Sequence, residues 1–267
     1  MDYERHIALN SGHAMPAMGL GTWQLTEDTA GTVVAALALG YRMIDSSGDY
    51  GTQPGIAEGI RRSGIKRSDI YLVTKIEEDE DAYEATGKNL RELGSDYVDL
   101  VLIHRPPDDG AGEDLWRGLM RARANGLARD IGVSNYSTDL IDTLITATGE
   151  TPAVNQIEWS PFGHSDEMLH YAEGKDMVIQ AYSPLTRTEQ LADRTLVEIA
   201  KKYDKSPAQL LIRWNLQNGT VPLPKANRRD HLEDDIDVFD FDIEVSDMMA
   251  LDRLNAHYSA LGTLPYV

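Results

Sequence analysis

The sequence predicts an α/β fold, a (β/α)8 TIM barrel with an N-terminal β-hairpin. Eight short apolar segments with strand character alternate with segments of helical periodicity. No linker or shift in composition interrupts this alternation. The chain has 267 residues and is 42% hydrophobic, which is enough for one barrel or for two small domains. The uninterrupted alternation favours a single barrel domain over residues 1–267.

The predicted hairpin covers residues 6–18, where two apolar runs flank the turn sequence Asn10-Ser11-Gly12-His13. We expect it to be a lid or plug of the barrel. A short strand follows at 19–23 and ends in the indole of Trp23. The next segment is predicted to be a helix at 28–39 because its apolar residues share one side: Val33, Val34, Leu37 and Ala38.

The second strand, at 41–45, ends its apolar run at Asp45. The helix at 54–62 opens with Pro54 in its first turn, a typical position for proline. The same alternation then repeats. The remaining strands are predicted at 70–75, 97–104, 130–135, 153–158, 177–183 and 220–225. The remaining helices are predicted at 79–93, 112–125, 137–147, 166–174, 190–203, 206–218 and 229–237.

Polar or aromatic residues stand at the ends of nearly all the predicted strands. The carboxyl ends of all barrel strands open onto the same face, so these side chains are expected to converge there. The converging set is Trp23, Asp45, Tyr50, Lys75, His104, Ser134, Asn135, Gln156, Tyr182 and Lys225. The sequence therefore predicts a functional site at this face.

Four members of the set suggest acid–base chemistry. An ammonium at Lys75 beside the Tyr50 phenol is expected to lower the tyrosine pKa from about 10, and a carboxylate at Asp45 would hold the lysine in place. His104 has an imidazole N–H that can align a carbonyl oxygen. The sequence has no cysteine and no serine in a Gly-x-Ser-x-Gly setting, so no nucleophile is evident. We therefore expect proton transfer at a polarised carbonyl, with electrons supplied by another group.

Composition excludes several kinds of partner. The formal net charge of −19 argues against nucleic acids and anionic membranes. Zero cysteines exclude disulfides and thiolate metal sites. Residues 1–13 lack the features of a signal peptide, so we expect a cytoplasmic protein. The acids are 27 Asp and 17 Glu and the bases 8 Lys and 17 Arg, which fits either a halophilic surface or a GC-rich genome with ordinary acidity.

The order of these segments resembles the aldo-keto reductase family. The matching segments are Gly19-Leu-Gly-Thr-Trp23, Arg42-Met-Ile-Asp45 with Tyr50-Gly51, Val73-Thr-Lys75, Asp99-Leu-Val-Leu-Ile-His104, Ile131-Gly-Val-Ser-Asn135, Asn155-Gln-Ile-Glu158, Ala181-Tyr-Ser-Pro184, Pro222-Leu-Pro-Lys225 and Val238-Phe-Asp-Phe241. The resemblance implies a barrel that binds an extended nicotinamide dinucleotide without a Rossmann glycine loop, and the chain has no G-x-G-x-x-G after a strand.

The resemblance implies NAD(P)H-dependent reduction of small aldehydes, ketones or sugar-like carbonyls to alcohols. Tyr50 would be the general acid, Lys75 and Asp45 its tuning pair, and His104 the residue that orients the substrate carbonyl. Trp23 and Arg105 would border the substrate pocket, and a short C-terminal tail would leave this pocket open. The cofactor would contact Thr22, Ser134, Asn135, Gln156, Tyr182, Ser183, Leu185, Lys225, Arg228 and His231.

The chain departs from the family pattern at the phosphate end of the cofactor. Ala226 replaces the usual serine, His231 replaces an arginine, and Asp234-Asp235 replaces Glu-Asn. Lys225 remains, and Arg228 has a guanidinium that can bind a phosphate through two hydrogen bonds. We therefore expect NADPH as the cofactor, with NADH tolerated better than is usual for the family.

Two alternatives stay open on the sequence. Asp45, His104 and Glu158 at strand ends could ligate a divalent metal, although the chain has no H-x-H or H-E-x-x-H spacing. A redox-sensing regulatory protein could keep the barrel and the cofactor but turn over slowly. The favoured prediction is an enzyme without a metal, acting as a monomer on a small carbonyl substrate. Trp116, which falls within a helical pattern, is predicted to lie in the core.

Overall fold

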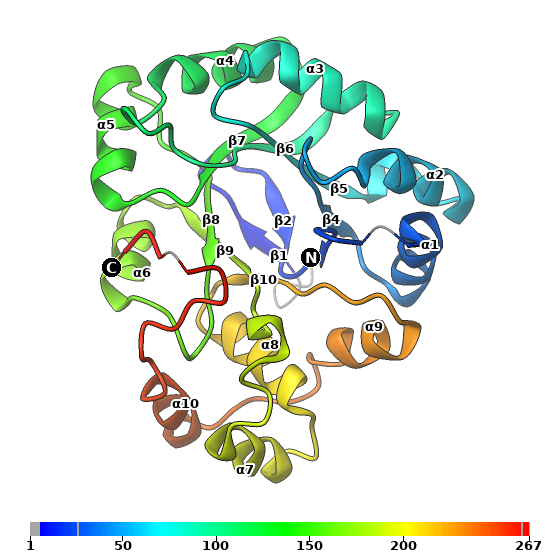
Figure 1. Cartoon of the computed structure of the whole chain (residues 1–267), viewed down its shortest axis with the longest axis vertical. Helices are drawn as coiled ribbons and strands as arrows, with labels where there is room; N and C mark the ends of the chain where they lie inside the picture. Colours follow the sequence, from blue (N-terminus) through cyan, green and yellow to red (C-terminus); the bar gives the residue numbers. More distant parts are fainter. Residues whose placement is uncertain (1–5, 26, 263, 267) are drawn as a thin grey trace.

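The computed structural model describes residues 6–25, 27–262 and 264–266. Eight parallel strands form one sheet in the order β10-β9-β8-β7-β6-β5-β4-β3, and helices surround it (Figure 1). The strands are β3 (Leu20–Gly21), β4 (Met43–Asp45), β5 (Tyr71–Ile76), β6 (Val98–Ile103), β7 (Ala128–Ser134), β8 (Val154–Glu158), β9 (Val178–Tyr182) and β10 (Val221–Leu223). The predicted (β/α)8 barrel is therefore confirmed.

Helices follow the strands as expected, but those predicted from residues 79 and 190 begin three to four residues later and one helix was not predicted. They are α1 (Thr29–Leu39), α2 (Gln53–Ser63), α3 (Ala82–Leu93), α4 (Glu113–Ala124), α5 (Thr138–Thr148), α6 (Asp166–Gly174), α7 (Arg194–Lys202), α8 (Pro207–Gln217), α9 (Arg229–Ile236) and α10 (Val245–Asp252), with short 3-10 turns η1 (Arg67–Asp69) and η2 (Thr186–Thr188). The helix predicted from residue 190 begins later because Asp193 caps it, accepting a hydrogen bond from the Leu196 N–H. Helix α10 was not predicted.

The ring closes between the first and last strands. The Gly19 N–H donates to Pro222 O at 3.1 Å, and the Gly21 N–H donates to Pro224 O at 2.9 Å. A Cβ atom on Gly21 would lie only 2.8 Å from Leu223 O, so this seam needs a residue without a side chain. The closed ring fixes the relative positions of all the strand ends.

The predicted hairpin plugs one end of the barrel. It consists of β1 (His6–Ala8) and β2 (Ala14–Pro16), which pair antiparallel. Met15 is fully buried and packs with the apolar residues inside the barrel, among them Met43 and Leu102. Residues 1–5, part of the stretch considered above for a signal peptide, lie outside the described residues.

Burial on both faces explains the apolar strands. All residues of β5 and β6 are buried because one face points into the barrel and the other packs beneath the helices. Trp116 of α4 is fully buried in the outer layer, as predicted. No helix in the part of the chain that the structure describes is long and apolar enough to span a membrane.

Candidate active site

The carboxyl ends of the barrel strands surround a cavity of about 860 Å³, a volume suited to small-molecule ligands. Lys75 lies fully buried beside this pocket. Arg228 and His231 lie outside the lining, exposed at the start of α9. The other predicted site residues line the pocket: Thr22, Trp23, Asp45, Tyr50, His104, Arg105, Ser134, Asn135, Gln156, Tyr182, Ser183, Leu185 and Lys225.

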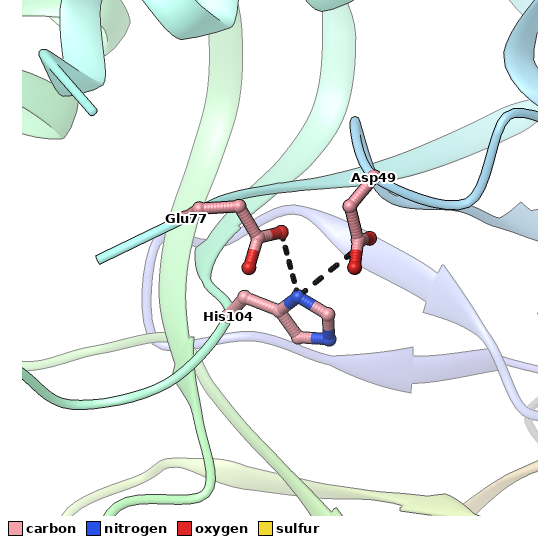
Figure 2. A group of neighbouring side chains, drawn as sticks. All are labelled: Asp49, Glu77 and His104. Carbon is pink, nitrogen blue, oxygen red and sulfur yellow. Dashed lines mark hydrogen bonds and ion pairs between the residues drawn. The ribbon is translucent and has the colours of Figure 1, made fainter. Parts of the chain in front are cut away.

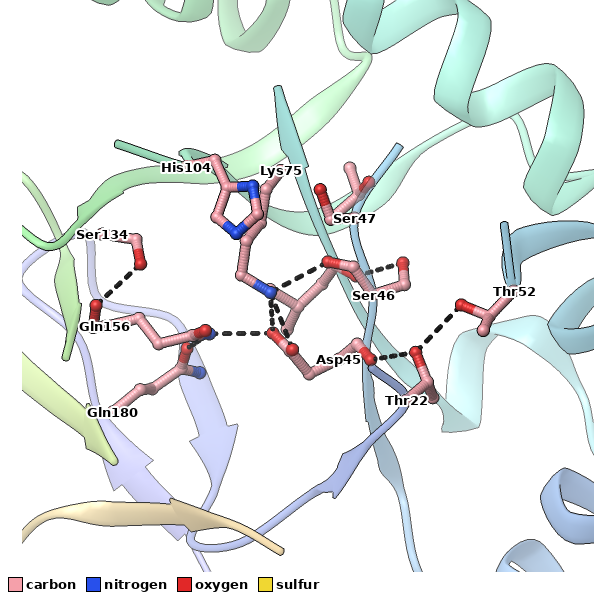
Figure 3. A network of polar contacts seen from close by, with 12 residues as sticks. Thr22, Asp45, Ser46, Ser47, Thr52, Lys75, His104, Ser134, Gln156 and Gln180 are labelled. Carbon is pink, nitrogen blue, oxygen red and sulfur yellow. Dashed lines mark hydrogen bonds and ion pairs between the residues drawn. The ribbon is translucent and has the colours of Figure 1, made fainter. Parts of the chain in front are cut away.

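A buried ion pair forms the floor of the pocket. The Lys75 ammonium on β5 donates to both carboxylate oxygens of Asp45 on β4, at 2.9 and 2.7 Å, and to Ser46 O at 3.0 Å (Figure 3). Burial is the largest single effect and acts to lower the pKa of Lys75, but the charges and hydrogen bonds of Asp45 and Tyr50 together raise it above its ordinary value. Lys75 is therefore a fixed positive charge at neutral pH.

The Asp45 carboxylate is held from the opposite side of the barrel as well. Gln156 on β8 donates from Nε2 to Asp45 Oδ1 at 2.8 Å and to Gln180 Oε1 at 2.9 Å (Figure 3). Thr22 donates to the backbone oxygen of Asp45 at 2.7 Å. Gln156 and Thr22, predicted as cofactor contacts, thus also position Asp45. Nothing in the sequence pattern singles out Gln180, which is a buried polar residue inside a barrel strand.

Tyr50 follows β4 on a turn and faces both Lys75 and His104. Its ring centroid lies 5.0 Å from Lys75 Nζ and 5.7 Å from the centroid of the His104 ring. Burial raises the pKa of the Tyr50 phenol, the Lys75 charge opposes this rise, and Asp45 and Asp49 add to it. The net pKa is raised, so the expectation of a lowered pKa was wrong. Desolvation outweighs the lysine, and Tyr50 keeps its proton at neutral pH.

His104 contacts two carboxylates that the sequence analysis missed. Its Nδ1 lies 2.7 Å from Glu77 Oε1 and 3.8 Å from Asp49 Oδ1 (Figure 2). Partial burial is the largest single effect and acts to raise the pKa of Glu77, but the hydrogen bond and charge of His104, with smaller contributions from Ser47 and Arg105, together bring it below its ordinary value. An ionised carboxylate only accepts, so the proton of this hydrogen bond belongs to Nδ1. Nε2 is left for a ligand in the pocket.

Asp45, His104 and Glu158, considered above as possible metal ligands, do not form a metal site. The Asp45 carboxylate pairs with Lys75. Glu158 instead accepts from the Ser259 hydroxyl at 2.6 Å and from the Ala260 N–H at 2.7 Å. A different group, Asp49, Glu77 and His104, brings its ligand atoms within 4.8 Å of one another, and it is the one group of this kind among the described residues (Figure 2).

Three polar side chains form a second cluster in the pocket, next to His104. The Tyr182 hydroxyl donates to Asn135 Oδ1 at 2.8 Å, and Asn135 donates to Ser134 Oγ at 3.1 Å. Asn135 also donates to His104 O at 3.0 Å, which joins this cluster to the residues around Tyr50 and Lys75 through His104. Asn135 has a left-handed backbone with φ of 64°, a conformation that asparagine tolerates better than most residues.

The residues at the predicted phosphate end are spread around β10 and α9. Lys225 is exposed at the edge of the pocket, whereas Ala226 is buried. Arg228 pairs with Asp230. Asp234 accepts from the Ser206 hydroxyl at 2.6 Å. Asp235 is buried, and desolvation together with the charge of Asp234 raises its pKa to about 7.

The outer rim of the pocket includes aromatic, basic and C-terminal residues. The indole of Trp23 is 38% exposed, and the guanidinium carbon of Arg187 lies 5.0 Å from its centroid. Leu261 also lines the pocket. The contacts of Glu158 with Ser259 and Ala260 hold this tail in place. The short tail therefore still reaches the pocket that we expected it to leave open.

A closed parallel barrel with a polar, partly charged pocket at the carboxyl ends of its strands defines a barrel enzyme. The aldo/keto reductase family model matches residues 17–256, and the chain belongs to this family. It is therefore an NAD(P)H-dependent oxidoreductase.

Individual relatives agree with this assignment. The chain is 39% identical to an aldo-keto reductase of Mycobacterium leprae over 93% of this chain and 90% of the relative. A crystal structure of an aldo/keto reductase from Brucella melitensis is 37% identical, with a TM-score of 0.88, covering 94% of this chain and 99% of that one. A Bombyx mori aldo-keto reductase in complex with NADP is 30% identical, with a TM-score of 0.89, covering 96% and 94%.

Proposed function

We propose that the protein reduces small aldehydes, ketones or sugar-like carbonyls to alcohols with NADPH. When bound, the nicotinamide supplies a hydride to the carbonyl carbon. The observation that carries the proposal is the convergence of Tyr50, His104 and the Lys75–Asp45 pair at one end of the pocket. A protonated phenol next to a fixed positive charge is the arrangement needed to protonate an alkoxide as it forms.

Each residue has a distinct role in this proposal. Tyr50 donates its proton to the substrate oxygen, and the Lys75 ammonium stabilises the phenolate that remains. Asp45 exchanges no proton with the substrate, because both of its carboxylate oxygens accept hydrogen bonds from Lys75. His104 donates to the carbonyl oxygen from Nε2–H, which requires a proton on both ring nitrogens because Nδ1–H is donated to Glu77. Trp23 provides an apolar wall.

The polar cluster of Ser134, Asn135 and Tyr182 is suited to the nicotinamide end of the cofactor. Its amide and hydroxyl groups can exchange their mutual hydrogen bonds for bonds to the nicotinamide carboxamide, and the Tyr182 ring offers a flat surface for stacking. Gln156 lies deeper in the barrel, where it donates to Asp45, and can contact the carboxamide from the floor of the pocket. We place Thr22, Ser183 and Leu185 along the same cofactor path.

We propose that NADPH is preferred and that NADH is also used. Lys225 can bind a 2'-phosphate, since no carboxylate pairs with it among the described residues. Arg228 must leave Asp230 to help, and His231 provides less charge than an arginine. These features weaken the discrimination between the two cofactors.

A panel of aldehydes and ketones, with NADPH oxidation followed by absorbance, tests the proposed activity. The result expected is reduction of several small carbonyls, unchanged by EDTA. Tight NADPH binding with no turnover of any carbonyl would instead support the regulatory alternative. We also propose a cytoplasmic monomer, which cell fractionation and sedimentation can test.

A further inference from the structure

The pocket differs in charge from the rest of the chain. Acids outnumber bases by 44 to 25 overall. The surface groove between α3 and α4 follows that trend, with acidic side chains at Glu78, Glu80, Asp81, Asp109, Glu113 and Asp114. The pocket, in contrast, is lined by three bases, Arg105, Arg187 and Lys225, and by two acids, Asp45 and Asp49. Asp45 is neutralised by Lys75, so the lining has an excess of positive charge.

The three bases of the lining are also without carboxylate partners. Within the described ranges, Arg105, Arg187 and Lys225 form no ion pair. Arginines on the outer helices behave differently, since Arg194 pairs with Glu198 at 2.7 Å. In a chain so rich in carboxylates, guanidinium groups left without one are available to an anionic ligand.

The positions of the three bases place one on the cofactor side of the pocket and another beside the site of the reacting carbonyl. Lys225 lies at the end of β10, on the cofactor side proposed above. Arg187 rests on the face of Trp23 at 5.0 Å. Arg105 directly follows His104 at the end of β6, and its charge acts on Tyr182 and on Glu77. Of the three, Arg105 is therefore beside the residue that binds the reacting carbonyl.

We propose that the pocket selects carbonyl substrates that carry a carboxylate, and that Arg105 binds this carboxylate. The planar guanidinium can form two parallel hydrogen bonds with it while the carbonyl oxygen lies between Tyr50 and His104. The positive lining also attracts such a substrate into the pocket of a negatively charged protein. This substrate class rests on the proposed carbonyl reduction.

A matched pair of substrates tests the inference. In the aldehyde 4-oxobutanoate and its methyl ester, the reacting group is the same and only the distal charge differs. The comparison uses kcat/KM for both compounds with saturating NADPH, in the wild type and in Arg105→Gln, Arg105→Lys and Arg187→Gln. Arg194→Gln is the control, because it removes one positive charge from the exposed surface of α7.

The wild type is expected to prefer the acid over the ester. Arg105→Gln should lower this preference about ten- to hundredfold, as expected for losing a charge-assisted hydrogen bond. Arg105→Lys should restore part of the preference, and Arg194→Gln should leave it as it is. Raising the salt concentration should weaken reduction of the acid more than that of the ester.

Three results would overturn the inference. The first is an equal kcat/KM for the acid and the ester in the wild type. The second is a ratio of the two values that Arg105→Gln leaves unchanged. The third is a ratio that falls to one in Arg187→Gln but is kept in Arg105→Gln. In each case reduction of the ester still supports the proposed carbonyl reductase activity. If no carbonyl compound is reduced at all, the proposed function itself fails.

Discussion

Asp235 makes the stability of the fold depend on pH. It lies buried on α9 next to Asp234, and its pKa rises from an ordinary 3.8 to about 7 because burial and the neighbouring charge disfavour the carboxylate. The folded state therefore holds the Asp235 proton more tightly than the unfolded state does. The resulting stability is fully present below pH 3.8 and is lost as the pH rises through about 7.

The magnitude follows from these two pKa values. At about 1.4 kcal/mol per pH unit, ionising Asp235 costs the folded state up to about 4 kcal/mol. Asp235→Asn removes the titration with little change in shape. The amide adds its own cost of burial, but that cost does not vary with pH. The change in relative stability between pH 5 and pH 8 thus isolates the carboxylate, and we expect it to be about 2 to 3 kcal/mol in favour of the variant.

Urea denaturation of both proteins at the two pH values measures this difference. Asp109→Asn is the control, since it removes a carboxylate from an exposed loop. If the stability of Asp235→Asn relative to the wild type is the same at both pH values, Asp235 is not buried as a protonated acid. The reasoning about α9 would then be refuted.

The other predictions concern the site and the surface. Glu77→Gln should lower kcat/KM for carbonyl reduction about tenfold, because His104 loses a charge-assisted hydrogen bond at Nδ1. Wild-type kinetics in this variant would show that Glu77 does not help to position His104. The ratio of kcat/KM for NADPH to that for NADH should stay below about a thousand, or about 4 kcal/mol, and a higher ratio would contradict the assigned roles of Ala226 and His231. If the acidic surface is halophilic, thermal stability should rise from low salt to molar KCl, whereas a curve indifferent to salt would favour the compositional explanation.

The sequence predicts the positions of the main site residues well because strand ends in a barrel converge. Asp45, Lys75 and His104 each end an apolar run, so their meeting follows from the fold alone. Glu77 was missed because it begins the acidic run Glu77-Glu-Asp-Glu80, which looks like an ordinary solvated loop. Its contact with His104 depends on how two loops approach each other, and the strand pattern contains no information about this approach.

The electrostatic properties of the site were harder to predict. The charges of Lys75 and Asp45 are evident in the sequence, but the extent to which Tyr50 loses water is not. That desolvation reversed the expected direction of its pKa shift. The buried Asp235 is a similar case, since a carboxylate in a polar helix of acidic residues gives no sign that it faces the core.

Replacing Tyr50 with Phe is the most direct test of the proposed mechanism. The substitution removes the hydroxyl and keeps the ring that packs against His104. We expect kcat for carbonyl reduction to fall by roughly two to four orders of magnitude, as for the loss of a general acid, while the Kd for NADPH stays nearly the same. A Tyr50→Phe variant that retains near-normal kcat would contradict the assignment of Tyr50 as the proton donor.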